Sequence, residues 1–424
     1  MKSTSKSNLS ALMLAASMSI GAAVVTSPAA AAAAAAAEPA KPTVSKAVVK
    51  QLADAQKAGQ AKKFDEALAK LAEAEAITTR TPYDTFVMHQ LRAYTYSQMG
   101  RTNDAIPSYI AELDSGFLSA DEQDRISRGV TTLYYQQKDY AKTTEFGQKV
   151  IAAGRADADA YFMIGHAYYL QDKYPEAIGI AKAYLAEAAK KGQKPSENSL
   201  LLLTQASAKQ RDIPGLTDSL GLLVEHYGKP DYWRDLLVTL RDNTGRGANN
   251  DVYTFNIYRL MRETSTLRES NDFLEMAQLA VQLGSPGEAV DALTRGQKAA
   301  VFTAESDKSA SRNQLQSAGK LAESDRAGLA KFEIEAKAAK AGEGDVRLGQ
   351  TYLSYDQPDK ALEALQRGIA KGSLRNADEA QILLGISLLR LGRKDEAAAA
   401  FKATKGTDAR LGNLARLWGI HARA

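Results

Sequence analysis

The sequence predicts an all-α protein built as a solenoid of stacked helical hairpins, and two observations support this. Marker residues recur with the period of a helical repeat, since Tyr140 and Tyr174 hold equivalent positions 34 residues apart. Apolar side chains also recur three, four and seven positions apart along most of the chain, as in Ala67, Leu71 and Ala74, which is the spacing of one helix face. Repeats of this length stack as helical hairpins and form a binding surface more often than a catalytic pocket.

Helical hairpins are expected to follow one another in the first half of the chain. Their ranges are 46–76, 82–113, a degenerate third around 130–150, the clearest copy at 158–188, and a weaker fifth at 198–227. We therefore predict an N-terminal repeat region over residues 38–228.

The middle and the C-terminal part are less regular. Residues 229–270 should form an irregular helical connector, with helices over 229–241 and 252–262 and a loop over 242–251. The rest, 271–424, should be a C-terminal repeat region with a capping helix. This region contains a polar insert at 303–343, which is either an exposed helix or a partly disordered insert. Two clean copies of the repeat follow at 345–371 and 378–404, and then a closing helix at 409–422. Such a helix would cover the apolar flank of the last hairpin.

The N-terminus has the layout of a secretory signal peptide over residues 1–37. Lys2 and Lys6 precede an apolar stretch from Leu9 to Val25, and small residues follow it from Ala29 to Ala37. An uncleaved membrane anchor is the alternative, but Ala, Ser and Gly dilute the apolar stretch and favour cleavage. We expect a periplasmic protein without a membrane span after cleavage, with secretion from the cell as the alternative.

Composition and motif spacing exclude several kinds of chemistry. The formal net charge is +4, and loss of Lys2 and Lys6 leaves the mature chain near +2, which is too mild to predict a nucleic-acid partner. The chain has no cysteine, and its four histidines have no metal-ligand spacing. Ser317 and Lys320 match an SxxK motif, but the companion motifs of serine enzymes are out of order or altered. We therefore predict no catalytic, cofactor-binding or metal site; the alternative is an enzyme whose active site is assembled across the connector.

The repeats share a set of marks. A small residue in the first helix is followed three positions later by an aromatic residue or Leu, then by a turn, and then by a small residue in the second helix. The small residues of the first helix are Ala93, Gly165, Gly349 and Gly385; the turns are at Gly100, Asp172, Asp356 and Gly392; the small residues of the second helix are Ala105, Ala177, Ala361 and Ala397. These marks resemble those of tetratricopeptide repeat proteins, of the exported bacterial type. The resemblance implies a right-handed superhelix whose concave face is lined mainly by first helices, and binding of proteins or peptides in that groove.

Some residues of the N-terminal region are not needed by the repeat. Of 18 tyrosines, 12 lie between Tyr83 and Tyr184, and packing accounts for seven of them. Those seven are Tyr96, Tyr109, Tyr134, Tyr140, Tyr161, Tyr168 and Tyr174. The register of the resemblance places a further set on the groove: Gln90, Tyr94, Arg128, Tyr135, Phe162, His166 and Tyr169. Aromatic side chains with a few polar groups suit a peptide-binding surface; packing against adjacent hairpins is the alternative explanation.

These observations predict a non-enzymatic periplasmic adaptor or scaffold that holds a protein or peptide in its concave groove and uses no cofactor. The alternative is a glycan- or peptidoglycan-binding accessory protein of the cell envelope, in which the same tyrosines would stack on sugar rings.

Overall fold

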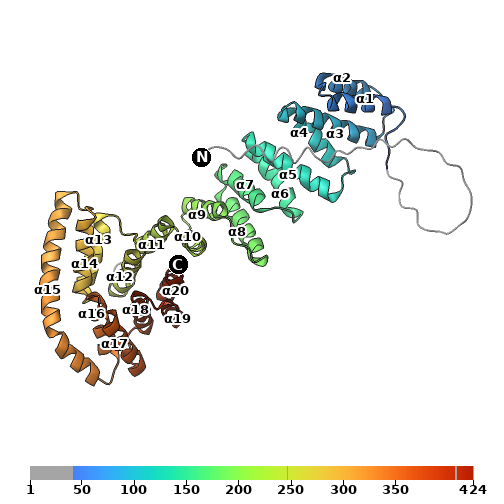
Figure 1. Cartoon of the computed structure of the whole chain (residues 1–424). Helices are drawn as coiled ribbons and strands as arrows, with labels where there is room; N and C mark the ends of the chain where they lie inside the picture. The colour runs from blue at the N-terminus through green and yellow to red at the C-terminus, as the bar shows by residue number, and fades with distance from the viewer. Residues whose placement is uncertain (1–41, 246, 406–407, 424) are drawn as a thin grey trace, which may run out of the picture. The chain divides into compact units, whose positions relative to one another are not determined.

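The computed structural model describes residues 42–245, 247–405 and 408–423 (Figure 1). The predicted signal peptide at 1–37 lies outside the described residues. Within them there are twenty helices and no strand, which confirms the all-α prediction. None of the helices found there is both long enough and apolar enough to cross a membrane. The chain divides into two compact units between Gln210 and Arg211, and each is described by itself.

Unit 1 is a series of helical hairpins. Its helices are α1 (Val49–Gln60), α2 (Phe64–Glu75), α3 (Pro82–Gln98), α4 (Thr102–Asp114), α5 (Ala120–Gln136), α6 (Tyr140–Ala152), α7 (Ala158–Tyr169), α8 (Tyr174–Lys190) and α9 (Glu197–Gln210). Each odd-numbered helix from α1 to α7 packs on the helix that follows it, and each even-numbered helix packs on the next hairpin. First helices also pack on one another, α1 on α3, α5 on α7 and α7 on α9. The first helices therefore share one face of unit 1.

The four predicted turns have the backbone conformation that ends a helix. Gly100 and Gly392 have φ of 70° and 74°, and Asp172 and Asp356 have φ of 57° and 54°. All four are left-handed, a conformation that Gly adopts freely and that Asp tolerates better than most residues. The chain can thus reverse direction between the two helices of a hairpin.

Small residues set how closely neighbouring helices approach. A Cβ added at Gly165 of α7 would lie 2.8 Å from Leu202 Cδ2 of α9, in the next hairpin, and 3.3 Å from Ile180 Cγ2 of α8, in the same hairpin. A Cβ at Gly349 would lie 2.5 Å from Leu365 Cγ. Only glycine fits such crossings without displacing a neighbour, because core packing leaves no spare volume.

Unit 2 also contains hairpins, with two departures from the repeat. Its helices are α10 (Ile213–Tyr227), α11 (Pro230–Asp242), α12 (Ala248–Glu263), α13 (Ser270–Gln282), α14 (Pro286–Lys298), α15 (Glu305–Ala338), α16 (Glu343–Ser354), α17 (Pro358–Lys371), α18 (Ala377–Arg390), α19 (Lys394–Lys402) and α20 (Ala409–Arg423). The polar insert is the single 34-residue helix α15, which packs on α13, α14 and α16. The exposed-helix interpretation of this insert is therefore the one the structure shows.

The second departure is helix α12, which lies inside unit 2. Nine of the ten residues from Tyr253 to Arg262 are almost fully buried, on every side of the helix; Thr254 alone is not among them. Helices α11, α13 and α20 pack on α12, and its polar side chains reach α14. A helix buried on all sides belongs to a core rather than to a solvent-facing wall.

Two expectations about the arrangement differ from the structure. The helix pair predicted at 198–227 is divided between the units, because α9 packs on α7 and α8 whereas α10 packs on α11. The connector predicted at 229–270 consists of α11 and α12 as expected, but α12 lies in the core of unit 2 and α11 packs on it. The closing helix α20 covers α18 and α19 as a cap would, and also packs on α10 and α12.

Candidate ligand-binding surface on unit 1

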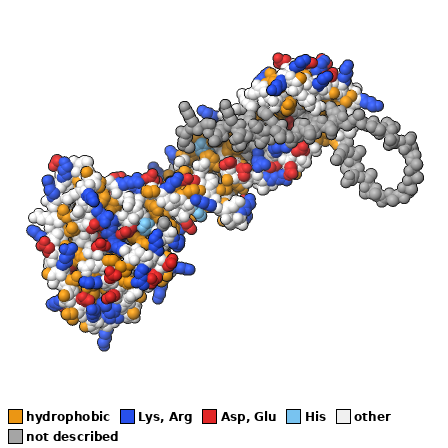
Figure 2. All heavy atoms as spheres, viewed as in Figure 1, with side chains coloured by type: hydrophobic (Ala, Val, Ile, Leu, Met, Phe, Trp, Pro, Cys, Tyr) orange, Lys and Arg blue, Asp and Glu red, His pale blue; other side chains and the backbone are white. Residues whose placement is uncertain are grey.

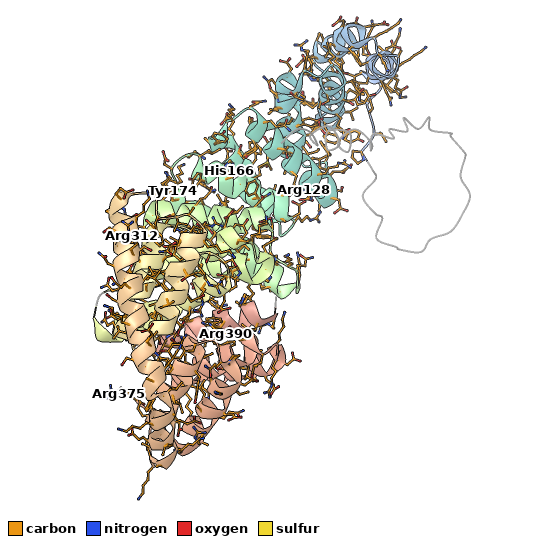
Figure 3. The ribbon with its side chains drawn as sticks, turned by 60° about the vertical axis from the view of Figure 1, so that its left-hand side comes forward. Arg128, His166, Tyr174, Arg312, Arg375 and Arg390 are labelled. Atoms are coloured by element: carbon orange, nitrogen blue, oxygen red, sulfur yellow. The ribbon has the colours of Figure 1, made fainter. Side chains whose placement is uncertain are left out.

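Six aromatic rings of unit 1 form one continuous set, which we call the aromatic chain. Its members are Tyr135 of α5, Tyr140 of α6, Phe162, His166 and Tyr169 of α7, and Tyr174 of α8. All six side chains are half-buried, so each has part of its ring in contact with protein and part open to solvent. Figure 3 labels His166 and Tyr174 on unit 1.

The centre of the aromatic chain follows from the helical spacing of α7. Phe162, His166 and Tyr169 are four and three positions apart, which places them on one face of the helix. The ring centroids of Phe162 and His166 are 5.5 Å apart with an interplanar angle of 11°, and those of His166 and Tyr169 are 6.2 Å apart with an angle of 8°. Helix α7 therefore presents three nearly parallel rings in a row.

Tyr135 joins this row from the preceding first helix. Its hydroxyl lies 2.6 Å from Nδ1 of His166. Burial lowers the pKa of His166 and raises the pKa of Tyr135, so the imidazole is neutral and the phenol keeps its proton near pH 7. The two uncharged groups share this hydrogen bond, whose donor is set by the tautomer of His166.

Two tyrosines that the sequence assigns to packing also join the chain, because they pack on its rings. Tyr140 meets Tyr135 edge-on at 6.1 Å between centroids, and Tyr174 meets Tyr169 at 5.3 Å. Each is the first residue of a second helix, directly after the turn that follows a first helix. This position in the sequence could have indicated the contact, because it brings the ring beside the last turn of the first helix.

The predicted groove residues fall into two groups. Tyr135, Phe162, His166 and Tyr169 come together in the aromatic chain. Arg128 lies on α5 and is held by carboxylates, 2.8 Å from Asp124 and 3.5 Å from Asp157.

Gln90 and Tyr94 lie on α3, away from these contacts. A Cβ added at Gly59 of α1 would lie 3.6 Å from the Tyr94 ring, so Tyr94 contacts an adjacent hairpin and lies outside the aromatic chain.

The geometry offers no support for the other chemistries weighed from the sequence. Ser317 and Lys320 are both exposed on α15, with no walled pocket around them. In the part of the chain that the structure describes, no group of three or more His, Asp or Glu side chains is arranged to hold a metal ion.

The largest group of buried charges lies in unit 2. Arg259 and Arg262 of α12 contact Glu288 of α14 at 2.7 and 3.0 Å, and all three side chains are at most 5% exposed. Burial alone would raise the pKa of Glu288, but the two guanidinium groups outweigh it and lower the pKa to about 2. Glu263 of α12 also contacts Arg390 of α18 at 3.1 Å, and Figure 3 labels Arg390 within unit 2. Every charge here has a partner in the same unit, so the group holds α12 in place.

Similarity to known proteins is found among solved structures. No protein-family model matches the sequence, and a search of curated proteins found no match. Among solved structures, a tetratricopeptide repeat protein from Parabacteroides merdae is 10% identical, covers 88% of this chain and 99% of its own, and has a TM-score of 0.31. The TPR domain of P58(IPK) is 13% identical, with 89% and 97% covered and a TM-score of 0.23. Yeast Tom70 is 11% identical, with 89% and 95% covered and a TM-score of 0.23.

The hairpins themselves give the fold of this chain. It is a tetratricopeptide-like α-solenoid. Paired helices, glycine at the helix crossings, left-handed turn residues and the packing of first helix on first helix all recur along the chain. Structural similarity at these TM-scores says nothing about a ligand or partner. The candidate site therefore rests on the geometry of unit 1 alone.

Proposed function

We propose that this protein is a non-enzymatic scaffold that binds a protein or peptide on the first-helix face of unit 1, through the aromatic chain. The observation that carries the proposal is the continuity of six half-buried rings across two successive hairpins. Large rings supply contact area at a small cost in side-chain entropy, and such residues dominate binding energy at protein interfaces. A helical scaffold that fixes the rings in advance lowers the cost of binding further.

We place this scaffold in the bacterial cell envelope. The support is the signal-peptide pattern of residues 1–37, with Lys2 and Lys6 ahead of an apolar stretch and an alanine tract. The absence of cysteine is compatible with an oxidising compartment, since a repeat array needs no disulfide. Fractionation of cells that produce the full-length chain, with N-terminal sequencing of the mature form, tests this placement. Recovery of an uncleaved chain in the cytosol would overturn it.

Affinity capture from envelope extract tests the binding surface. Three baits are compared: the wild-type chain, the double variant Tyr135→Ala/Tyr169→Ala, and the control Tyr94→Ala, which removes a half-buried tyrosine outside the aromatic chain. We expect partners to be lost with the double variant and retained with the control. Circular dichroism melting of all three baits separates loss of binding from loss of fold.

Binding of envelope glycan is the competing outcome. Aromatic rings also stack on sugars, so co-sedimentation with purified cell-wall sacculi is measured with the same three baits at high salt, where charge-driven adsorption is screened. Sedimentation that depends on Tyr135 and Tyr169, together with no captured protein, would replace the peptide-binding proposal with the glycan alternative.

A further inference from the structure

We propose that the aromatic chain takes a basic peptide segment, and that a Lys or Arg side chain of this ligand binds at Tyr169, Tyr174 and Asp172, which we call the ring corner. This inference rests on the proposed function and names the class of peptide that the same surface binds. Three observations support it: the geometry of the ring corner, the lack of a cation over its rings within the described residues, and a comparison with the preceding hairpin.

The ring corner lies at the turn between α7 and α8. The ring centroids of Tyr169 and Tyr174 are 5.3 Å apart and the ring planes meet at 63°, so the two rings form two walls of a corner. The Tyr174 hydroxyl donates to Oδ1 of Asp172 at 2.5 Å, and Asp172 is exposed. A cation is attracted by the negative face of an aromatic ring and by a carboxylate. An ammonium or guanidinium group therefore suits this corner.

The rings of the aromatic chain are not covered by cations of the protein itself. Elsewhere in unit 1 such cover is present, since Arg101 lies 4.9 Å from the ring centroid of Tyr96 and Lys149 lies 4.6 Å from that of Phe146. Within the described residues, no Lys or Arg lies over any of the six rings of the aromatic chain. The solvent-facing parts of these rings are thus available to a cation of a partner.

The preceding hairpin contains an equivalent ring pair with the opposite charge balance. Tyr135 and Tyr140 lie 34 residues before the tyrosines of the ring corner and also meet edge-on. Residues 135–142 contain two Lys and one Asp, whereas residues 169–176 contain one Lys, one Asp and one Glu. The same pair of rings is therefore set among excess basic charge in one hairpin and among excess acidic charge in the next.

The carboxylates of the two hairpins also differ in their partners. Asp139 lies 3.6 Å from Lys142, so the protein itself supplies its cation. Glu176 takes the place of Lys142 in the next hairpin, and no ion pair reaches Asp172 in the part of the chain that the structure describes. The one base nearby, Lys173, donates from Nζ to a glutamine side chain. A basic ligand would supply the cation that the ring corner lacks.

This preference for a base is local, because unit 1 shows no broad acidic patch on the face seen in Figure 2. Basic and acidic side chains are interspersed there. A general attraction between the protein and a basic peptide would involve every exposed carboxylate of unit 1 to a similar degree. Dependence on Asp172 but not on Asp139 therefore distinguishes the ring corner from such an attraction.

Isothermal titration calorimetry tests the inference on protein purified from cells that produce the full-length chain. The ligands are three capped peptides of equal length in which every second residue is Lys, norleucine or Glu and the others are Ser. We expect the Lys peptide to bind and the Glu peptide not to bind. The norleucine peptide should bind about 20-fold more weakly than the Lys peptide, because it loses the attraction of both the rings and the carboxylate.

Two pairs of variants test the ring corner. Asp172→Asn removes the charge and should weaken binding of the Lys peptide by about 5-fold. Its matched control, Asp139→Asn, keeps a good helix cap and should change the affinity by less than about twofold. Tyr169→Leu removes the ring and should also weaken binding by about 5-fold, whereas Tyr169→Phe keeps the ring face and should have less than about a twofold effect. Circular dichroism melting confirms that each variant is folded.

The outcomes separate this inference from the proposed function. Equal or tighter binding of the norleucine or Glu peptide, or equal effects of Asp172→Asn and Asp139→Asn, overturns the inference of a basic ligand. If the Lys peptide fails to bind while captured partners still depend on Tyr135 and Tyr169, the inference is wrong and the proposed function stands. If capture also fails to depend on those tyrosines, both are wrong.

Discussion

The two units use the same hairpins in different ways. In unit 1 the first-helix face carries half-buried rings. Hydrogen bonds between its hairpins join residues that are close in sequence, such as Ser45 N and Asp84 Oδ1, which are 39 residues apart. In unit 2 the inside is filled by the unit's own helix α12. Side-chain hydrogen bonds of unit 2 join residues 127 and 191 positions apart, Arg390 with Glu263 of α12 and, on the surface, Arg416 of α20 with Glu225 of α10. A repeat array can thus leave its inner face available or fill it with its own chain, and the proposed binding surface belongs to the first arrangement.

This difference has a consequence for folding. A plain solenoid is stabilised by contacts between neighbouring repeats and can unfold from an end. In unit 2 the last helix, α20, packs on the first helix, α10, and on α12, as well as on α18 and α19. The first and last helices of unit 2 therefore stabilise each other. We therefore expect unit 2 to unfold in one cooperative step, and unit 1 to lose its terminal hairpins more gradually.

The largest effect should come from the buried charges of unit 2. Glu288→Ala leaves Arg259 and Arg262 buried without their shared carboxylate, and should lower the free energy of unfolding by about 3–5 kcal/mol. Urea denaturation followed by circular dichroism measures this change. The matched control is Glu396→Ala, which removes an exposed partner of Arg393 and should cost less than about 1 kcal/mol. Equal effects of the two substitutions would contradict the view that α12 is held by a buried charge network.

The next effect tests the close helix crossing of unit 1. Gly165→Leu forces a side chain against Leu202 and Ile180 and should destabilise unit 1 by about 1–3 kcal/mol. Gly179→Ala in the adjacent helix α8 is the control, since a Cβ there meets nothing within 4 Å. Alanine favours the helix, so this control should stabilise by about 0.5–1 kcal/mol. An unchanged melting temperature for Gly165→Leu would show that the register assigned to α7 is wrong.

A smaller, pH-dependent effect is expected at Glu112 in unit 1. Burial raises the pKa of its carboxyl group to about 8, and Oε1 has no hydrogen-bond partner in the described structure. The folded state therefore holds a proton that the unfolded chain releases above about pH 4.5, and Glu112 costs stability as pH rises from there to about 8. Glu112→Gln removes that cost and should stabilise unit 1 by about 1–2 kcal/mol at pH 8.

Thermal melts at pH 4 and pH 8 test this expectation. The gain from Glu112→Gln should be present at pH 8 and nearly absent at pH 4. A gain of the same size at both values would mean that the substitution acts through packing rather than through the proton.

The smallest effect concerns His166 in the aromatic chain. Its lowered pKa means that the unfolded chain takes up a proton before the folded chain does, so unit 1 loses stability as pH falls below about 6.5. His166→Phe keeps a ring in the row and removes this titration. Because the side chain is half-exposed, we expect the difference in pH dependence to be less than about 1 kcal/mol. Melting curves between pH 7 and pH 5 measure it, and identical slopes for the two proteins would contradict it.

Much of the fold could be predicted from the sequence, because hairpin repeats are local. The small residues Gly165 and Gly349 and the turns at Asp172 and Asp356 sit where their spacing places them. The interior position of α12 could not be predicted, since its all-round burial needs α20, which lies far along the chain, as well as its neighbours α11 and α13. Likewise Tyr140 and Tyr174 match core positions of the repeat, and only the structure shows their rings extending those of Tyr135 and Tyr169.

The central claim is that unit 1, and not unit 2, presents the ligand surface, and site-specific photo-crosslinking in intact cells tests it most directly. A photoreactive phenylalanine is placed, one position at a time, at Tyr140 and Tyr169 of the aromatic chain, at Tyr94 of α3, and at Tyr232 of α11 in unit 2. We predict that Tyr140 and Tyr169 give the same discrete adduct and that Tyr94 and Tyr232 give none. An adduct at Tyr232 with none at Tyr140 or Tyr169 would contradict the claim.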